Sequence, residues 1–409
     1  MTENRRLLKW VSMRGSDDFA SLEPSRRGTL TASRKAQLAR RVHKGVPDAI
    51  RGVVWQALSG ARSWAVPDYH GLRARATVEP PTEELDPAVV DQIELDLNRT
   101  FPSHVLWLPP RPTVLDGGDT PIGGPGGSVR TDSAVDEPFE VVEADTADLA
   151  REMAAELAAE EEEEEEWDSV SDLRAPSDLS CTSSSAVSSF SGIEARMESL
   201  AVDLAASAEA PSPGVELLRT LLRMYALHDP EVCYCQSMNF VAATLLIYTT
   251  PVVAFRIFAH LLGPLGFRRM YLPGLPLLME CFEELQLQMD QKLPRLARHL
   301  QRHNVHPSLF ATQWFMTFGS DQFPFAMALR LLDLVFYERS LEPLFRLSLA
   351  LLQKRQRALV AIRDPCALMS ALRQLPSDVG DLDGLFAKLV GQRIKLSREL
   401  LRGAGGKAG

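Results

Sequence analysis

Hydrophobic residues recur at helical spacing along most of the chain. Residues 47–60 show this clearly, because Ile50, Val54 and Leu58 fall four positions apart and lie on one face of a helix. Alternation of apolar and polar residues, typical of strands, is scarce. The pattern predicts an all-α fold with short loops, packed irregularly and not as a simple four-helix bundle. The expected helices cover residues 36–42, 47–60, 86–97, 215–228, 235–249, 251–262, 275–290, 292–303, 307–318, 322–337 and 341–361.

Two regions interrupt this helical pattern. Residues 65–85 contain three prolines and are expected to form a loop. Residues 109–212 are rich in Gly, Pro, Ser and acidic side chains, and they are expected to be mostly disordered because they cannot bury enough apolar surface. Within them, residues 146–166 end in seven consecutive glutamates. Their charges repel one another, so at most a transient helix is expected there.

These patterns predict five regions. A lead-in covers residues 1–40, the first part of a helical domain covers 41–108, and the insert covers 109–212. The second part of the helical domain covers 213–362. The tail at 363–409 is expected to carry a basic amphipathic helix at 386–402, with its positive charges at Lys388, Arg393, Lys395, Arg398 and Arg402. Either contact with anionic lipid or a solvated helix would account for these charges, and the solvated helix is the favoured interpretation.

Charge is distributed unevenly. The whole chain has a net charge of -10. Residues 111–210 contain 25 acidic and 5 basic residues, a net charge of -20, which leaves +10 for the rest of the chain. A basic remainder is compatible with an acidic protein partner or a membrane surface. There is no zinc-finger spacing and no interleaving of basic and aromatic residues, so the sequence does not point to nucleic acid.

The cysteines and histidines do not predict a metal site. The five cysteines are irregularly spaced, and Cys233 and Cys235 have no second pair to complete a zinc site, although this pair alone keeps that alternative open. Reduced thiols in a cytosolic protein are expected. His299, His303 and His306 have spacings of four and three, but the last precedes a proline and is expected beyond the helix end. We therefore predict surface histidines.

The chain shows no sign of a membrane-spanning segment. Its first residues are polar, without the pattern of a signal peptide. The longest apolar run, residues 240–255, is interrupted by threonines and a proline. It falls short of the roughly 20 residues that a spanning helix needs, so a buried core segment is expected. The sequence therefore predicts a cytoplasmic protein.

Two short segments could carry chemistry, although no G-x-S-x-G, H-E-x-x-H or phosphate-binding glycine loop is present. In the first, Asp96 and Arg99 lie three positions apart, so the carboxylate can hold the guanidinium. A surface ion pair is the alternative interpretation. The second segment begins with Tyr234, Cys235 and Gln236, and its alternative is a helix-capping turn with a buried glutamine. Because no phosphate-binding glycine loop is present, any nucleotide that this protein acts on would be bound by a partner.

With their flanks, these segments resemble the TBC-domain Rab GTPase-activating proteins. Four blocks carry the resemblance, in the same order along the chain as in the family, over roughly residues 44–360 outside the insert. Each block alone would be weak evidence. The blocks are K-G-V-P-D-A-I-R-G-V-V-W at 44–55, I-E-L-D-L-N-R followed by T-F-P at 93–102, Y-C-Q at 234–236 preceded by Y-A-L-H-D-P-E-V at 225–232, and P-S-L-F-A-T-Q-W-F-M-T-F at 307–318 followed by L-R-L-L-D at 329–333.

The resemblance implies a TBC fold and two side chains supplied in trans to a GTPase. Arg99 would be the arginine finger that neutralises charge on the transferring phosphoryl group. Gln236 would orient the attacking water. Asp96 would hold Arg99, while Tyr234 and Asn239 would shape the loop that presents Gln236. Arg51 is predicted to be a supporting or GTPase-binding residue. Together with Trp55 it is expected to be buried and to support the fold.

The implied partner is a Rab-type small GTPase in its GTP form. GTP and Mg²⁺ would arrive with that partner, so no cofactor of the chain itself is expected. Association with endomembranes would be peripheral and would pass through the lipid-anchored partner. The chain would be an activator of an enzyme, and a role in vesicle trafficking and intracellular protein transport would follow.

The sequence departs from the family pattern at three positions. Ser237 and Cys233 stand where the family usually has glycine, on either side of the Y-C-Q motif. If either position needs a positive φ, a side chain there would strain the loop. Leu332 replaces a tryptophan and predicts a repacked core. These departures keep open an alternative function, a catalytically weak or inactive TBC scaffold that binds small GTPases or trafficking proteins.

The two finger positions are 137 residues apart, far more than is usual in the family, because the acidic insert lies between them. An insert of this length is tolerable, since the entropy of loop closure grows only logarithmically with length. Two hypotheses account for it. Its glutamates compete for the basic surface that receives the GTPase or recruit a third protein, or the insert is a solvated spacer, which is the favoured interpretation.

Overall fold

The computed structural model describes residues 2–14, 19–66, 68–78, 84–102, 104, 212–392 and 394–397. All of these described residues belong to one compact unit. The insert predicted at 109–212 lies outside the described residues except for Ser212, and so does the transient helix predicted at 146–166.

Within the described part of the chain the regular structure is helical, and no strand occurs there. The all-α prediction is confirmed. The elements are α1 (Thr2–Arg14), η1 (Ala20–Leu22), α2 (Pro24–Arg27), α3 (Ala32–Lys44), α4 (Asp48–Ser59), α5 (Tyr69–Ala76), α6 (Pro87–Leu97), α9 (Pro213–His228), α10 (Met238–Tyr248), α11 (Pro251–Leu262), η4 (Phe267–Met270), α12 (Pro276–Lys292), α13 (Pro294–Arg302), η5 (Pro307–Leu309), α14 (Thr312–Met316), α15 (Phe325–Glu338), α16 (Glu342–Ala361), α17 (Pro365–Gln374), η6 (Leu375–Asp378) and α18 (Leu382–Gly391).

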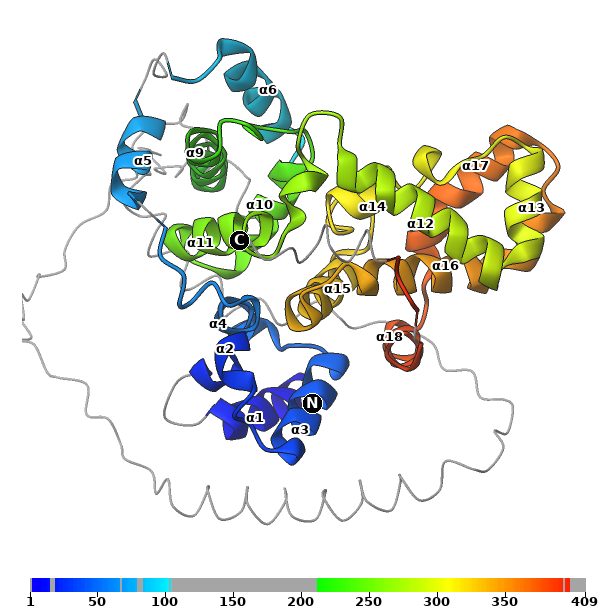
Figure 1. Cartoon of the computed structure of the whole chain (residues 1–409), viewed down its shortest axis with the longest axis horizontal. Coiled ribbons are helices and arrows are strands. Elements are labelled where there is room, and N and C mark those ends of the chain that lie inside the picture. The colour runs from blue at the N-terminus through cyan, green and yellow to red at the C-terminus, as the bar shows by residue number, and fades with distance from the viewer. Residues whose placement is uncertain are drawn as a thin grey trace, which may run out of the picture. The chain divides into compact units, whose positions relative to one another are not determined.

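The core centres on helices that are buried on most of their surface. α10 packs against α9 and α11, and α15 packs against α4 and α16 (Figure 1). Met238, Val241 and Leu245 of α10 are fully or almost fully buried. Residues 240–255, predicted to be core, therefore lie in α10 and the first turns of α11. Among the described helices, none is long and apolar enough to span a bilayer.

The helix at 48–59 shows how the local sequence sets the boundaries. Pro47 is the N-cap, and Gly60 ends the helix at φ 90°, a conformation that glycine adopts without strain. Between these ends, Val54, Trp55 and Leu58 are fully buried. Burying this face stabilises the fold through the hydrophobic effect, and it orients α4 for its contact with α15.

The prediction of a loop across 65–85 is wrong for Tyr69–Ala76, which form α5. Asp68 is the N-cap of α5, and its carboxylate accepts a hydrogen bond of 3.2 Å from the N–H of Gly71. Only Leu72 and Ala76 of α5 are buried, and the helix packs against α9. With two buried residues in eight, the apolar pattern was too sparse to show this helix in the sequence.

The single helix predicted at 307–318 is also wrong, because two short elements occupy this range. η5 and α14 are separated at Phe310 and Ala311, and α14 ends at Met316. Phe318 and Gly319 then have positive φ angles of 50° and 79°. The chain turns here so that Trp314, Phe315 and Phe318 can all be buried. Tertiary packing has overridden the local helical pattern.

The two ends of the chain carry more packed helix than the sequence indicated. Trp10 and Met13 of α1 are buried, and α17 occupies a range where no helix was predicted. The basic helix expected at 386–402 is wrong in its bounds, since α18 ends at Gly391 and residues 394–397 are not helical. α18 also packs against α3 and α16, which replaces the favoured interpretation of a solvated terminal helix.

Candidate functional site

The first candidate segment lies at the end of α6. Asp86 caps the start of this helix by accepting a hydrogen bond of 2.9 Å from the N–H of Ala88. The helix ends at Leu97, so Arg99 lies just beyond its C-terminus. The Arg99 side chain is 47% exposed, whereas Asp96 is fully buried. Leu95, one of the exposed apolar side chains, lies four positions before Arg99 in the last turn of α6.

Asp96 joins the two segments that the sequence singled out. Its carboxylate forms an ion pair with the Arg99 guanidinium. It also accepts a hydrogen bond of 3.3 Å from the amide of Gln92 and one of 2.5 Å from the hydroxyl of Tyr234, 138 positions away. Three donors on one buried carboxylate satisfy a charge that would otherwise be costly to bury. Asp96 therefore ties the chain at Arg99 to the loop that carries Gln236.

A second layer of bonds fixes the same junction. The Asn239 side-chain amide donates to the Thr100 hydroxyl over 2.8 Å and to the Asp96 carbonyl over 3.5 Å. The Thr100 hydroxyl in turn donates to that carbonyl over 2.6 Å. Phe101 packs edge to face on Phe240 and on Phe325, with both ring-centroid distances at 5.7 Å. The segment after Arg99 is thereby held on α10 and α15.

The loop between α9 and α10 is fastened at its start by Arg268. The guanidinium donates two hydrogen bonds to the Asp229 carboxylate, over 2.6 and 2.7 Å, and one of 2.7 Å to Glu231. Burial alone would raise the pKa of Asp229, but the hydrogen bonds and charge of Arg268 hold it below its usual value. The carboxylate stays ionised at neutral pH and keeps this anchor in place.

Two residues of this loop have left-handed backbone conformations. Cys233 has φ 55° and Ser237 has φ 95°, and these are the two positions at which the family usually has glycine. The strain considered at these positions from the sequence is therefore present. Between them, Gln236 is exposed, and Ser237 is buried at the start of α10. The tight turn presents the glutamine at the surface.

Burial keeps the phenol and the two thiols of this loop protonated. It raises the pKa of the Tyr234 phenol, although the nearby charge of Arg99 acts in the opposite direction. The phenol can therefore donate to Asp96 throughout the neutral range. Burial also raises the pKa of the Cys233 and Cys235 thiols, so neither has the lowered pKa of an activated nucleophile.

Arg51 belongs to a different network. It is buried, and its Nε donates to the Asp333 carboxylate over 3.4 Å. The same carboxylate accepts hydrogen bonds of 2.7 Å from the Trp55 indole and 2.9 Å from the N–H of Val46. Arg51 and Trp55 thus support the contact of α4 with α15, and the structure does not bring Arg51 together with Arg99 and Gln236.

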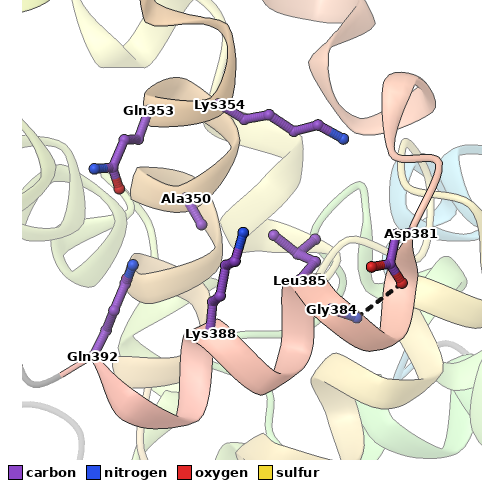
Figure 2. Close-up of a pocket in the computed structure, with 8 residues that line it drawn as sticks. All are labelled: Ala350, Gln353, Lys354, Asp381, Gly384, Leu385, Lys388 and Gln392. Atoms are coloured by element: carbon purple, nitrogen blue, oxygen red, sulfur yellow. Dashed lines mark hydrogen bonds between the residues drawn. The ribbon is translucent and has the colours of Figure 1, made fainter. Parts of the chain in front are cut away.

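A hollow of about 390 Å³ lies between α16 and α18 (Figure 2). Lys354 and Lys388 line it together with the amides of Gln353 and Gln392, while Asp381 uses its carboxylate to cap α18 through the N–H of Gly384. None of the residues lining this hollow is a candidate finger residue. Side chains that act on a partner need to protrude and not to enclose a ligand, so the candidate site is the exposed surface around Arg99 and Gln236.

The histidines predicted at the surface are partly exposed. The rings of His299 and His303 meet edge to face at 4.6 Å, and His306 hydrogen-bonds to Ser308 over 3.0 Å. Among the described residues, no group of three His, Cys, Asp or Glu side chains could hold a metal ion.

The structure joins four of the six predicted site residues, Asp96, Arg99, Tyr234 and Asn239, in one network, and Gln236 is exposed on the loop between Tyr234 and Asn239. Sequence reasoning missed the supporting residues around them. The phenylalanine and threonine after Arg99 were seen only as part of a motif. Gln92 lies one helical turn before Asp96, a spacing that could have indicated their contact. The other supporting residues that the sequence did not single out are Asp229, Arg268 and Gln313.

A family comparison identifies the fold that holds this site. The model of the Rab-GTPase-TBC domain family matches residues 193–360, which include the whole loop that carries Gln236. This part of the chain is similar to the Rab-GTPase-TBC domains. The predicted resemblance to this family is therefore confirmed over residues 193–360, which include the Y-C-Q segment.

Two curated relatives are similar to part of this chain. GTPase-activating protein GYP5 of Saccharomyces cerevisiae is 34% identical over 150 residues, which cover 36% of this chain and 17% of that protein. The human ecotropic viral integration site 5 protein homolog is 32% identical over 182 residues, covering 44% of this chain and 22% of that protein. The chain thus spans about a fifth of the length of these relatives.

Solved structures share the TBC fold. The crystal structure of the Chlamydomonas flagellar RabGAP TBC domain superposes with a TM-score of 0.53 and 18% identity, covering 88% of this chain and 85% of that one. The Ypt/Rab-GAP domain of Gyp1p gives a TM-score of 0.52 and 14% identity, covering 87% of this chain and 91% of that one. At these low sequence identities the two comparisons bear on the fold alone. Because they cover 88% and 87% of this chain, the likeness in fold extends well beyond residues 193–360.

Proposed function

We propose that this chain accelerates GTP hydrolysis by a Rab-type small GTPase. One observation carries the proposal: the buried Asp96 carboxylate bonds both Arg99 and Tyr234, and so it joins two segments whose exposed side chains are the two predicted fingers. The kinship with TBC domains supports it, as does the name of the yeast relative, a GTPase-activating protein. GTP and Mg²⁺ would come with the partner in its GTP form.

In this mechanism Arg99 stabilises the charge that develops on the transferring phosphoryl oxygens. One nitrogen of its guanidinium is held by Asp96, which leaves the other N–H donors of the planar fork for the phosphoryl group. A finger of this kind contributes roughly 10³–10⁵ in rate, or about 4–7 kcal/mol. Lysine would be a poor replacement because a single ammonium cannot contact two oxygens with the same geometry.

Gln236 acts on the other side of the reaction by orienting the attacking water. Its loop is held at three places: by Arg268 on Asp229, by Tyr234 on Asp96, and by Asn239 on the segment after Arg99. This preorganisation matters, since a catalytic group that is already in position loses no further entropy when the GTPase binds. The chain acts in the cytoplasm and reaches endomembranes peripherally through its partner.

A second candidate function is a TBC scaffold that binds a GTPase without accelerating hydrolysis. The positive φ angles of Cys233 and Ser237 favour it, because side chains at these positions strain the loop that presents Gln236. The exposure of Arg99 and its ion pair with Asp96 oppose it, since a scaffold has no need of a poised guanidinium.

Single-turnover GTP hydrolysis measured across a panel of Rab proteins tests the proposal. We expect acceleration of at least one of them by a factor of roughly 10³ or more. A titration of binding is measured on the same panel with the GTP-loaded form. Binding to a Rab without acceleration of any member would reject the catalytic proposal in favour of the scaffold.

A further inference from the structure

Ser237 is an L-residue in a conformation that suits glycine. It is the N-cap of α10 with φ 95° and ψ -19°, and it is 1% exposed. A side chain at this φ crowds the neighbouring carbonyl, so serine holds the conformation only where other contacts compensate. The position follows Gln236 directly. Whatever compensates for the strain at Ser237 therefore also fixes the direction in which Gln236 leaves the turn.

The compensating contact lies on α14. The Ser237 hydroxyl donates a hydrogen bond of 3.0 Å to Oε1 of Gln313. Gln313 sits on a rigid support, because Trp314 and Phe315 beside it are buried in the core. The backbone N–H of Ser237 is bound independently, to the side chain of Asn239 over 3.2 Å. A glycine would adopt the same backbone without strain but would have no hydroxyl to offer Gln313.

Two other side-chain restraints on this loop act further from Gln236. Arg268 holds Asp229 at the start of the loop, and Tyr234 reaches Asp96 two positions before the glutamine. The bond between Ser237 and Gln313 lies directly beside Gln236 and ties the turn to α14. The bond from the Ser237 N–H to Asn239, and the bond of 3.1 Å from the Met238 N–H to the Cys235 carbonyl, stay within the segment 235–239. Without it, the turn at 235–238 would keep its strain and lose a contact that opposes it.

We propose that Ser237 and Gln313 form a positioning pair that holds the Gln236 loop in its presenting conformation. The catalytic meaning of the pair rests on the function proposed above, whereas the restraint on the loop does not. Gln313 thereby becomes a positioning residue of the site, reached through a side chain where the family usually has none.

Hydrogen exchange in the free protein tests the restraint directly. Ser237→Ala removes the donor and keeps the strained Cβ, while Gln313→Met removes the acceptor at similar size. Each is expected to speed exchange in the peptide 234–238 roughly 2- to 10-fold, the range for losing one hydrogen bond. The double variant should exchange no faster than the single variants, because both remove the same bond. Gln313→Glu, which keeps an acceptor oxygen, should match the wild type.

Unchanged exchange in Ser237→Ala, or effects of the two substitutions that multiply in the double variant, would overturn the pair. The catalytic arm uses single-turnover hydrolysis by a responding Rab. Ser237→Ala and Gln313→Met should each lower the maximal rate severalfold and leave the half-saturating concentration of this protein unchanged. Gln313→Glu should keep the wild-type rate. A rise in that concentration with no change in maximal rate would overturn the positioning role. If no Rab responds to the wild type, the function proposed above fails, while the exchange measurement still decides the restraint.

Discussion

At the residue scale, the candidate site depends most on the carboxylate of Asp96. It is fully buried and accepts from Gln92, Arg99 and Tyr234. The contact with Arg99 was predictable because the two residues lie three apart at a helix end. The contact with Tyr234 was not predicted, since nothing in residue spacing tells which distant side chain reaches a buried carboxylate.

Tyr234→Phe should destabilise the fold and loosen the loop. The substitution removes one donor from a buried carboxylate, and an acceptor left without its partner costs about 1–3 kcal/mol. Urea unfolding at neutral pH measures the loss in unfolding free energy. Tyr69→Phe, on α5, is the matched control and should change the value by less than about 0.5 kcal/mol. Equal stability of Tyr234→Phe and the wild type would contradict the role of this bond.

His260 makes a separate prediction about acid stability. Burial, assisted by the nearby charge of Arg339, lowers its pKa from 6.5 to about 4. The folded state therefore binds this proton less readily than the unfolded chain. The resulting stability is present above pH 6.5 and is lost as the pH falls towards 4, with about 2 kcal/mol lost between pH 7 and pH 5.

His260→Phe should reduce this acid sensitivity. Phenylalanine keeps an aromatic ring against Trp64, which meets His260 edge to face at 5.5 Å, and it cannot take up a proton. Urea unfolding at pH 7 and at pH 5 gives the difference for each protein. The variant should lose about 2 kcal/mol less than the wild type over this range. Identical losses would mean that His260 does not contribute to acid unfolding.

At the scale of the elements, the long apolar helices were predictable and the short ones were not. The prediction for 251–262 matches α11, because Thr250 and Pro251 set its start and Gly263 its end. α5 was not predicted, and α14 was predicted as part of a longer helix. Tertiary packing, and not the local hydrophobic pattern, defines both of them. The contact between α6 and α9 was also invisible in the sequence. Glu94 and Arg219 form its two-pronged ion pair across 125 positions, at 2.7 and 2.9 Å.

Asp333→Ala should destabilise the fold by weakening the contact of α15 with the junction of α3 and α4. Asp333 is fully buried and accepts from Val46, Arg51 and Trp55, so its removal leaves a buried guanidinium without this partner. Breaking a buried pair in this way costs about 3–5 kcal/mol. Thermal and urea unfolding report the loss.

Asp383→Ala is the control for this substitution. Its carboxylate also pairs with arginines, but its side chain is 68% exposed, so the expected loss is below about 1 kcal/mol. Comparable losses for the two substitutions would show that burial of the carboxylate is not what makes Asp333 important.

At the scale of the whole molecule, the site is assembled from two stretches of chain on either side of the insert. The described parts of 84–104 and 212–392 belong to one compact unit. Motif order revealed this assembly from the sequence, because the four blocks kept their family order despite the interruption. What the sequence could not give is which of the two hypotheses for the insert holds.

Deleting residues 112–208 should leave the helical unit intact. Loop closure costs about 0.6 kcal/mol for each doubling of length, so shortening this connection roughly tenfold should raise the unfolding free energy by only about 2 kcal/mol. The same variant separates the two hypotheses for the insert through the rate of GTP hydrolysis at several salt concentrations. Unchanged activity and salt dependence would support the spacer, and a higher activity that is less sensitive to salt would support competition by the glutamates.

The central claim is that Arg99 and Gln236 act together on one bound GTPase. Single-turnover hydrolysis of a responding Rab, with Arg99→Ala, Gln236→Ala and the double variant, tests it most directly. We predict that Arg99→Ala lowers the accelerated rate of GTP hydrolysis by a factor of roughly 10³–10⁵. Gln236→Ala should also lower the rate severely. The double variant should be little slower than the slower of the two single variants, because the two groups work as a unit. Acceleration that survives both substitutions would contradict the account.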